Sequence, residues 1–421
     1  MLWKPLAPTG DLALLRDSPF LLLLVGRFVA ILASVAAPVA LAFGVLAAPG
    51  GTPTRLSIVM ACESIPLLAF VLVGGVIADR VQRSRVVVVG LVLSAVSFGS
   101  IGAMLVQGAP SWWLVGGAAA VSGIGIAVMN PALAAIVPEL VPVEQLHAAN
   151  SIIGVARNVA RILGVVTAGL LVTLLGGGWT LVGCGTALLL AAAPFAFLRP
   201  RRVLAHSASG KSLFGDLRDG WTEFRSREWV WVVVLQSSLH FACYGAAIGV
   251  IGPALVTAEL GGAKTWSWLL ACESAGTLAG AVLALRWKPE RTILASVIAV
   301  AVTMPTPFIL LGLDAPLPAV LVAIFFTGVG MSLIAVLWSV TVQLKIPAHA
   351  LSRVSSYDAL GSLLMSPLAL MLAGPAVALL GARPAMLLCG ALLVVITASG
   401  LISRDVRTVK LNQPEPPVEE P

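Results

Sequence analysis

Apolar residues follow one another in long runs along this chain, and short polar segments separate the runs. Each run is long enough to cross a hydrocarbon core of about 30 Å as an α-helix. Strands of a membrane barrel would be shorter and would alternate polar with apolar residues, which these runs do not do. The pattern therefore predicts an all-α polytopic membrane protein. Its twelve transmembrane helices are expected at about residues 20–46, 56–78, 86–107, 112–136, 149–175, 178–198, 229–257, 265–285, 292–313, 317–342, 354–379 and 384–402.

The composition agrees with a membrane protein. The 421 residues are 59% hydrophobic and 11% charged, and the mean hydropathy is +1.01, whereas soluble domains carry about 25% charged residues. The first run is too long for a cleavable signal peptide, and eleven more follow it. The five cysteines all fall within predicted spans, which indicates packed free thiols rather than a disulfide or metal framework.

The basic residues predict the orientation. If both termini are cytoplasmic, twenty Lys and Arg residues lie on the inner side, and only Arg55, Lys264 and Arg383 lie outside. An anionic inner leaflet then explains the net charge of +7 without a nucleic-acid partner. Arg far outnumbers Lys, and Ala, Gly and Val are abundant, which indicates a bacterial source. We therefore expect a multi-pass protein of a bacterial plasma (inner) membrane.

Two pairs of similar segments predict that the two halves of the chain arose by duplication. The letters ACES occur at 61–64 and again at 271–274, and residues 141–176 align without gaps to 346–381. Six-helix halves in parallel orientation are one architecture of secondary transporters. The expected organisation is a cytoplasmic segment 1–19, an N-terminal half 20–198, a linker 199–228, a C-terminal half 229–403 and a disordered tail 404–421.

Acids inside apolar runs are the first candidate site residues. Glu63 and Glu273 lie at matching depth in the second and eighth runs, and Asp358 lies near the start of the eleventh. A charge at the centre of a span costs roughly 2.5–3.5 kcal/mol on insertion scales, so each acid should face a partner or a wet cavity. One interpretation is a proton or substrate site, and the other is hydrogen bonding of a neutral acid between helices.

Three arginines also fall within predicted spans. Arg157 and Arg161 are four residues apart and share one helix face. They are expected either to attract an anionic substrate or to form a structural ion pair. Arg27 either belongs to the site or extends its charged end toward the inner surface.

One loop carries a family resemblance. The segment GGVIADRVQRSRVVVV at 74–89 resembles the signature loop of the major facilitator superfamily, with Gly75, Asp79, Arg80 and Arg83 at its glycine, aspartate and arginine positions. The segments NPALAAIVPELVPVEQLHAANSIIGVARNVARILG and SRVSSYDALGSLLMSPLALMLAGP resemble the enterobactin-exporter-like branch, also called transmembrane secretion effectors, which includes macrolide-efflux-type pumps.

The resemblance implies the major facilitator fold and a function. It implies multidrug-type efflux by an antiporter that exports an amphipathic small molecule through alternating access, with the proton gradient as energy source. It also implies a gating contact between Asp79 and the start of the eleventh span, where Arg353 lies. No cofactor or metal is expected, and the partners are the small-molecule substrate and the bilayer around a monomer.

Other functions are disfavoured by the motifs. The segment AHSASGKS at 205–212 resembles a phosphate-binding loop, but the linker leaves no room for the nucleotide-binding domain that such a loop requires. No HExxH, GxSxG or paired CxxC pattern occurs, so we expect no enzyme. An importer of a nutrient or metabolite and a non-transporting membrane sensor remain as alternatives.

Overall fold

The computed structural model describes residues 11–198, 221–222, 224–287, 289, 291–346, 354, 357–358, 360–403, 405 and 407. Side chains at 11–13, 71–80, 134–135, 143 and 285 are not described. The chain forms two compact units, Met1–Ser207 (unit 1) and Ala208–Pro421 (unit 2). Most of the predicted linker 199–228, with its phosphate-loop-like segment, and most of the tail lie outside the described residues.

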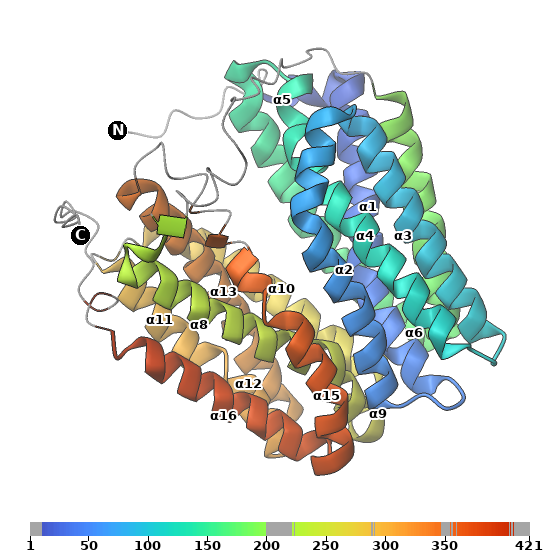
Figure 1. Ribbon diagram of the computed structural model, residues 1–421, viewed down its shortest axis with the longest axis vertical. Helices are drawn as coiled ribbons and strands as arrows, with labels where there is room; N and C mark the ends of the chain where they lie inside the picture. Colours follow the sequence, from blue (N-terminus) through green and yellow to red (C-terminus); the bar gives the residue numbers. More distant parts are fainter. Residues whose placement is uncertain are drawn as a thin grey trace. The chain divides into compact units, whose positions relative to one another are not determined.

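Unit 1 is built of helices that lie alongside one another (Figure 1). In chain order its elements are the 3₁₀ turn η1 (Asp11–Arg16), α1 (Ser18–Ala47), α2 (Pro53–Arg80), α3 (Arg83–Val106), α4 (Trp112–Ala135), the short α5 (Val137–Leu140), the 3₁₀ turn η2 (Val143–Gln145) and α6 (Leu146–Phe197).

Unit 2 is also built of helices (Figure 1). Its elements are α8 (Glu228–Ala246), a π-helical turn η3 (Ala247–Ile251), α9 (Gly252–Glu259), α10 (Ala263–Arg286), α11 (Thr292–Thr303), α12 (Thr306–Gly312), α13 (Leu317–Lys345), α15 (Ser366–Leu380) and α16 (Ala382–Gly400).

The helices have the length and composition of membrane spans. In the described ranges, eleven helical segments are long and apolar enough to cross a membrane. One of them, Leu146–Phe197, has 52 residues, about 78 Å of helix, which is enough for two crossings. It is broken at Gly176, where φ is 83° and ψ is 162°. These segments confirm the predicted all-α polytopic fold, with the fifth and sixth spans joined at Gly176.

The similarity between the two halves includes the backbone conformation of the glycine that ends each aligned segment. Gly381 has φ 91° and ψ 160°, almost the same values as Gly176, and the two glycines end the aligned segments 141–176 and 346–381. Residues other than glycine rarely adopt such positive φ angles. Each unit therefore turns between its last two spans with the same glycine-dependent geometry.

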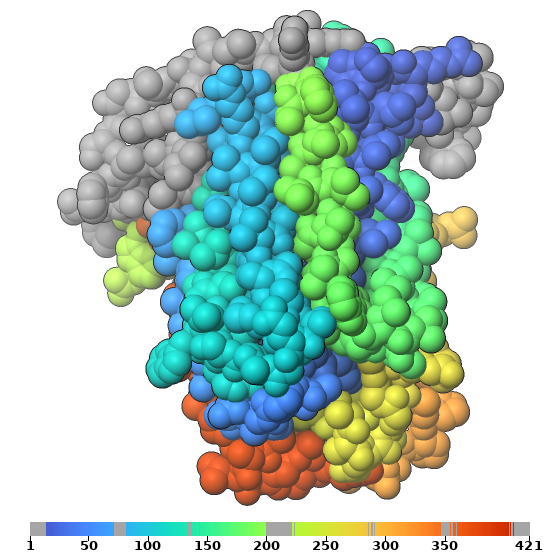
Figure 2. Space-filling view, turned by 90° about the vertical axis from the view of Figure 1, so that its right-hand side faces the viewer, coloured from blue at the N-terminus to red at the C-terminus, as the bar shows by residue number. Residues whose placement is uncertain are grey.

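Helix neighbours repeat between the units. In unit 1, α2 packs against α4, α3 packs against α4 and α6, and α1 packs against α6. Figure 2 shows the second part of α6, in green, between α3 in light blue and the start of α1 in dark blue. In unit 2, α10 packs against α13, α11 and α12 pack against α13, and α8 packs against α15 and α16. Each unit is thus one copy of the same arrangement.

One helix of unit 2 is interrupted at a proline pair. Between α11 and α12 the chain turns at Met304 and Pro305, and Pro307 has no N–H to donate to the carbonyl oxygen of Thr303. The hydroxyl of Thr327, from α13, donates to that oxygen at 2.6 Å. A side chain from a neighbouring helix thus satisfies a carbonyl that the break exposes, as a span in hydrocarbon requires.

Glycines allow two equivalent helix pairs to approach closely. A side chain at Gly123 of α4 would clash with the carbonyl oxygen of Glu63 in α2, and one at Gly328 of α13 would clash with the carbonyl oxygen of Glu273 in α10. Small residues at such crossings are the usual means by which membrane helices pack. The two ACES segments therefore lie at the same kind of contact in each unit.

The end of unit 2 where α9 stops is held by charged groups. Arg383, at the start of α16, donates from Nε to Oε2 of Glu259 at 2.5 Å and from Nη2 to Oδ1 of Asp314 at 2.6 Å. Asp314 has a positive φ of 59°. One guanidinium therefore joins the end of α9, the loop after α12 and the start of α16.

We expect Gly123→Ala and Gly328→Ala each to lower the free energy of unfolding by about 1–3 kcal/mol, because the added methyl group forces α2 from α4, or α10 from α13. Thermal unfolding of the purified protein in detergent measures the loss. Gly117→Ala is the matched control in α4, because no atom lies within 4 Å of a Cβ built there. Equal stability of Gly117→Ala and Gly123→Ala would contradict the close contact.

Candidate functional site

The acid of the first ACES segment has a partner on α4. Ser122 donates its hydroxyl hydrogen to Oε1 of Glu63 at 3.0 Å, and the Glu63 side chain is half-buried. Ser122 directly precedes Gly123, so the close approach of α2 and α4 brings the hydroxyl to the carboxyl group. In unit 2 the corresponding pair is Thr327 and Gly328, and the Thr327 hydroxyl reaches Thr303 of α11. The two copies have thus diverged in how the equivalent hydroxyl is used.

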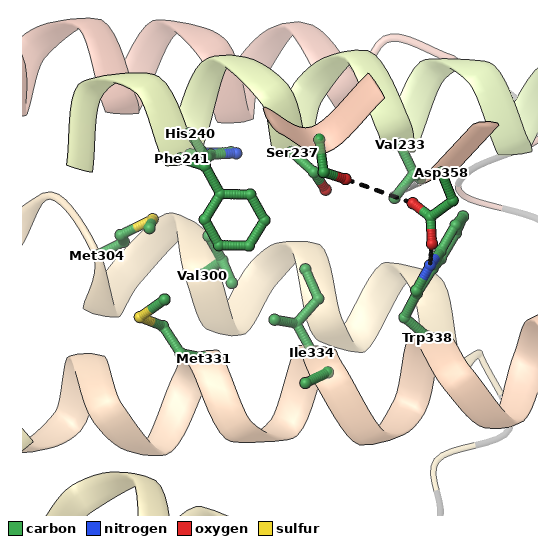
Figure 3. Close-up of a pocket in the computed structure, with 12 residues that line it drawn as sticks. Val233, Ser237, His240, Phe241, Val300, Met304, Met331, Ile334, Trp338 and Asp358 are labelled. Atoms are coloured by element: carbon green, nitrogen blue, oxygen red, sulfur yellow. Dashed lines mark hydrogen bonds between the residues drawn. The ribbon is translucent and has the colours of Figure 1, made fainter. Parts of the chain in front are cut away.

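Unit 2 contains a cavity of about 280 Å³ between α8, α11, α13 and the helical turn before α15. Figure 3 shows its walls, which are mainly apolar side chains with a few polar groups. The lining residues are Val233, Ser237, His240, Phe241, Val300, Met304, Met331, Ile334, Ala335, Trp338, Asp358 and Ser362.

Asp358 is the acid of this cavity and is fixed by two donors. The indole Nε1–H of Trp338 donates to Oδ2 at 2.8 Å, and the hydroxyl of Ser362 donates to Oδ1 at 3.4 Å. The aspartate side chain is half-buried. Each carboxylate oxygen thus accepts one hydrogen bond from a neighbouring side chain. Trp338 itself packs edge-on against Trp229, with ring centroids 5.7 Å apart, so the donor is held in place.

Another polar side chain of the cavity is His240. Its side chain is buried, and Nε2 lies 2.8 Å from the hydroxyl oxygen of Thr397 in α16. The same hydroxyl donates to the carbonyl oxygen of Leu393 at 2.8 Å. A hydroxyl hydrogen that points to Leu393 leaves the Thr397 oxygen to accept, so His240 donates from Nε2. The histidine is therefore anchored to α16 behind the cavity wall.

Sequence reasoning found Asp358 but missed its surroundings. Trp338 and His240 lie inside apolar runs, where a tryptophan or histidine indicates packing as readily as a site. Trp338 also lies only four residues before the end of its predicted run at 342, where a tryptophan at a membrane boundary is ordinary, so no sequence signal singled it out. Only the tertiary structure, with α13 packed against α11 and Trp338 of α13 against Trp229 of α8, brings these side chains to one cavity.

The arginines predicted within spans lie in unit 1. Arg27 of α1 is half-buried, and its Nη1 donates to the carbonyl oxygen of Leu133 at 3.4 Å. Arg157 and Arg161 lie in α6, and both side chains are exposed. The charge of Arg157 lies close enough to interact with that of Arg27. The structure thus places two of the three cations near each other, with Arg161 on the same face of α6.

One arginine of the signature loop forms a buried ion pair. Nη1 of Arg83, at the start of α3, lies 3.0 Å from Oε1 of Glu139 in α5, and the two side chains are 9% and 11% exposed. Glu139 was not among the residues predicted from the sequence. The pair joins the signature loop to the segment that follows α4.

The other signature residues are only partly described. Gly75, Asp79 and Arg80 lie in the last turns of α2, but their side chains are outside the described part of the structure, and so is Arg353. Among the described residues, no group of three His, Cys, Asp or Glu side chains lies close enough together to hold a metal ion. All five cysteines are free, as predicted.

Two units of membrane-spanning helices, repeated in the same arrangement and with a cavity inside one of them, are typical of secondary transporters. The chain matches the model of the Major Facilitator Superfamily over residues 21–370. It therefore belongs to this superfamily of transporters. No curated protein matches the chain.

Solved structures share the fold at low sequence identity. The nucleoside transporter NupG matches with a TM-score of 0.73 and 12% identity, over 93% of this chain and 100% of that one. A bacterial homolog of the human lysosomal transporter Spinster matches with a TM-score of 0.69 and 14% identity, over 94% and 97%. A POT family transporter in complex with 5-aminolevulinic acid matches with a TM-score of 0.70 and 14% identity, over 91% and 95%.

We expect Arg83→Ala and Glu139→Ala each to lower the free energy of unfolding by about 3–5 kcal/mol, because each variant removes one member of a buried ion pair. Denaturant titration in micelles measures the effect. The double variant should lose less than the sum of the single losses. Arg85→Ala is the matched control, because Arg85 is exposed one half-turn away. A loss as large in Arg85→Ala would show that the ion pair is not the cause.

Proposed function

We propose that this protein is a proton-coupled exporter of an amphipathic small molecule, such as a drug, a siderophore or a secondary metabolite, within the enterobactin-exporter-like branch of the superfamily. The observation that carries the proposal is the cavity of unit 2. Its walls are mostly apolar, and one carboxylate, Asp358, is fixed there by Trp338 and Ser362. Such a lining suits a ligand with an apolar body and a polar group.

The direction and the energy source rest on the branch resemblance. In the proposed cycle the two units alternate access to the cavity, and protons entering the cell drive the substrate out. No cofactor is needed, because the proton gradient supplies the energy, and the monomer is the working unit.

Glu63 is the proposed proton site. It lies within a span, and Ser122 offers a hydroxyl to the carboxyl group. Protonation removes the charge, so the acid is cheaper to hold in apolar surroundings after it has bound a proton. An acid at a helix crossing that gains and loses water during the cycle would therefore bind and release protons in step with it. Glu273 occupies the equivalent position in unit 2 and is the second candidate.

The test compares the accumulation of ethidium, a macrolide and a catecholate siderophore in cells with and without the protein. We expect severalfold lower accumulation of at least one compound in expressing cells, and loss of the difference when an uncoupler collapses the proton gradient. Glu63→Gln keeps the shape of the side chain and removes its titration, so gradient-driven export should be lost while the protein still reaches the membrane.

Glu144→Gln is the control, because Glu144 is an exposed acid of the same unit and its loss should leave export unchanged. Higher accumulation in expressing cells would favour an importer. No change for any compound would favour a non-transporting role. Export that persists in Glu63→Gln and in Glu273→Gln would move the proton site to another residue.

The proposed orientation places both termini in the cytoplasm of a bacterium, with the protein in the inner membrane. It is supported by the basic residues, which are concentrated in the segments assigned to the inner side. Anionic headgroups of the inner leaflet then face these segments.

A reporter fused after Arg404 should therefore be active in the cytoplasm, and one inserted near Gly262, between α9 and α10, should be active on the outer side. Paired fusions to alkaline phosphatase and to green fluorescent protein measure both locations. Phosphatase activity of the fusion after Arg404 would show that the C-terminus lies on the outer side, which would contradict the proposed orientation but not the number of helices.

A further inference from the structure

The cavity of unit 2 has two chemically different ends. In Figure 3, Asp358 and Trp338 lie at one end, beside Val233. Phe241, Met304 and Met331 lie toward the other end. Val233 and His240 are seven residues apart on α8, which corresponds to about 10 Å of helix. A ligand along this cavity would meet a carboxylate at its head and a phenyl ring and thioethers at its tail.

The charges of the lining decide between ligand classes. Among the described residues that line the cavity, Asp358 is the one acid, and neither Lys nor Arg is present. An anionic head would be repelled by Asp358 and would find no cation there. Ca²⁺ and Mg²⁺ prefer a shell of six or more oxygens, whereas this wall offers the Asp358 carboxylate and the hydroxyls of Ser237 and Ser362. A zinc site takes at least three protein ligands, and no group of three His, Cys, Asp or Glu side chains lies together among the described residues. An organic cation satisfies the carboxylate and also fills the apolar part.

The geometry of Asp358 suits such a head group. Trp338 and Ser362 donate one hydrogen bond to each carboxylate oxygen, and each oxygen can accept another. An ammonium group has only donors, so it complements this acceptor with a charge-assisted hydrogen bond. Methionine side chains adapt to tails of different shape, which suits the wall around Met304 and Met331.

We propose that this cavity is the site for an organic ammonium ion about 10 Å long, with its nitrogen at Asp358 and its apolar tail between Phe241, Met304 and Met331. The inference rests on the proposed function and names the substrate class of the same transporter. The cavity volume of about 280 Å³ is at the small end of ligand pockets, so the ligand is a small amine.

The test is calorimetric titration of the purified full-length protein in nanodiscs, with empty nanodiscs subtracted. The probes are 4-phenylbutylamine, the neutral 4-phenylbutan-1-ol and the anionic 4-phenylbutyrate, which share one apolar body. We expect the amine to bind about tenfold or more tightly than the alcohol, because only the amine pairs with the carboxylate. The acid should bind more weakly than the alcohol.

Asp358→Asn should remove the advantage of the amine and leave the affinity for the alcohol within about twofold. The control is Asp314→Asn, which changes an acid to its amide in the same unit but outside the cavity, at a positive φ that asparagine tolerates. It should leave all three affinities unchanged. Ala335→Phe fills the cavity from an exposed position of α13 and should weaken the amine and the alcohol together, which keeps the test decisive if Asp358→Asn does not fold.

Three results would each overturn the proposal. They are equal affinities for the amine and the alcohol, an unchanged amine affinity in Asp358→Asn, and binding of 4-phenylbutyrate that is tighter than that of the alcohol. Absence of binding by any probe, together with export in the cell assay, would overturn it and leave the proposed function standing. Amine binding that depends on Asp358, without any transport in cells, would support the site and refute the transporter cycle proposed for it.

Discussion

A polar group in the hydrocarbon is costly without a partner inside the protein, and this constraint shapes both units. Many hydroxyls within the helices donate to a carbonyl one turn earlier, as Thr173 does to Gly169 and Thr341 does to Leu337. Where the backbone is interrupted, a neighbouring helix must help, and Thr327 reaches the carbonyl oxygen of Thr303 at the proline break. The same requirement accounts for the two donors around Asp358, because a carboxylate in a span is costly without them.

Close contact between helices is the second consequence, since membrane helices associate through packing rather than through exclusion of water. Gly123 and Gly328 bring α4 and α13 against the carbonyl oxygens of Glu63 and Glu273. After duplication, the hydroxyl residue that precedes each glycine took a different role. Ser122 contacts an acid on α2, whereas Thr327 stabilises a broken helix whose Met304 lines the cavity. The two units thus share one architecture and differ in chemistry.

The candidate chemistry is therefore divided between the units. Unit 1 holds Glu63 beside Ser122 and the buried pair of Arg83 and Glu139. Unit 2 holds the amphipathic cavity with Asp358 at one end. In the proposed cycle, an acid of unit 1 binds the proton and an acid of unit 2 binds the substrate. The alternating movement of the two units then couples these two binding events.

The sequence by itself determined the helical membrane fold, the duplication and the positions of the buried charges, because run length, repeated segments and the cost of charge in hydrocarbon are properties of local sequence. It pointed to Asp358 and Glu63 for the same reason, and to Arg83 through the resemblance of the segment 74–89 to the superfamily's signature loop. Only the tertiary structure gave these residues their partners. Trp338 is 20 residues from Asp358, and Ser122 is 59 residues from Glu63. Arg83 begins α3, and Glu139 follows only after the whole of α3 and α4. Such pairs depend on which helix faces pack together, and apolar runs without a polar stripe do not specify that.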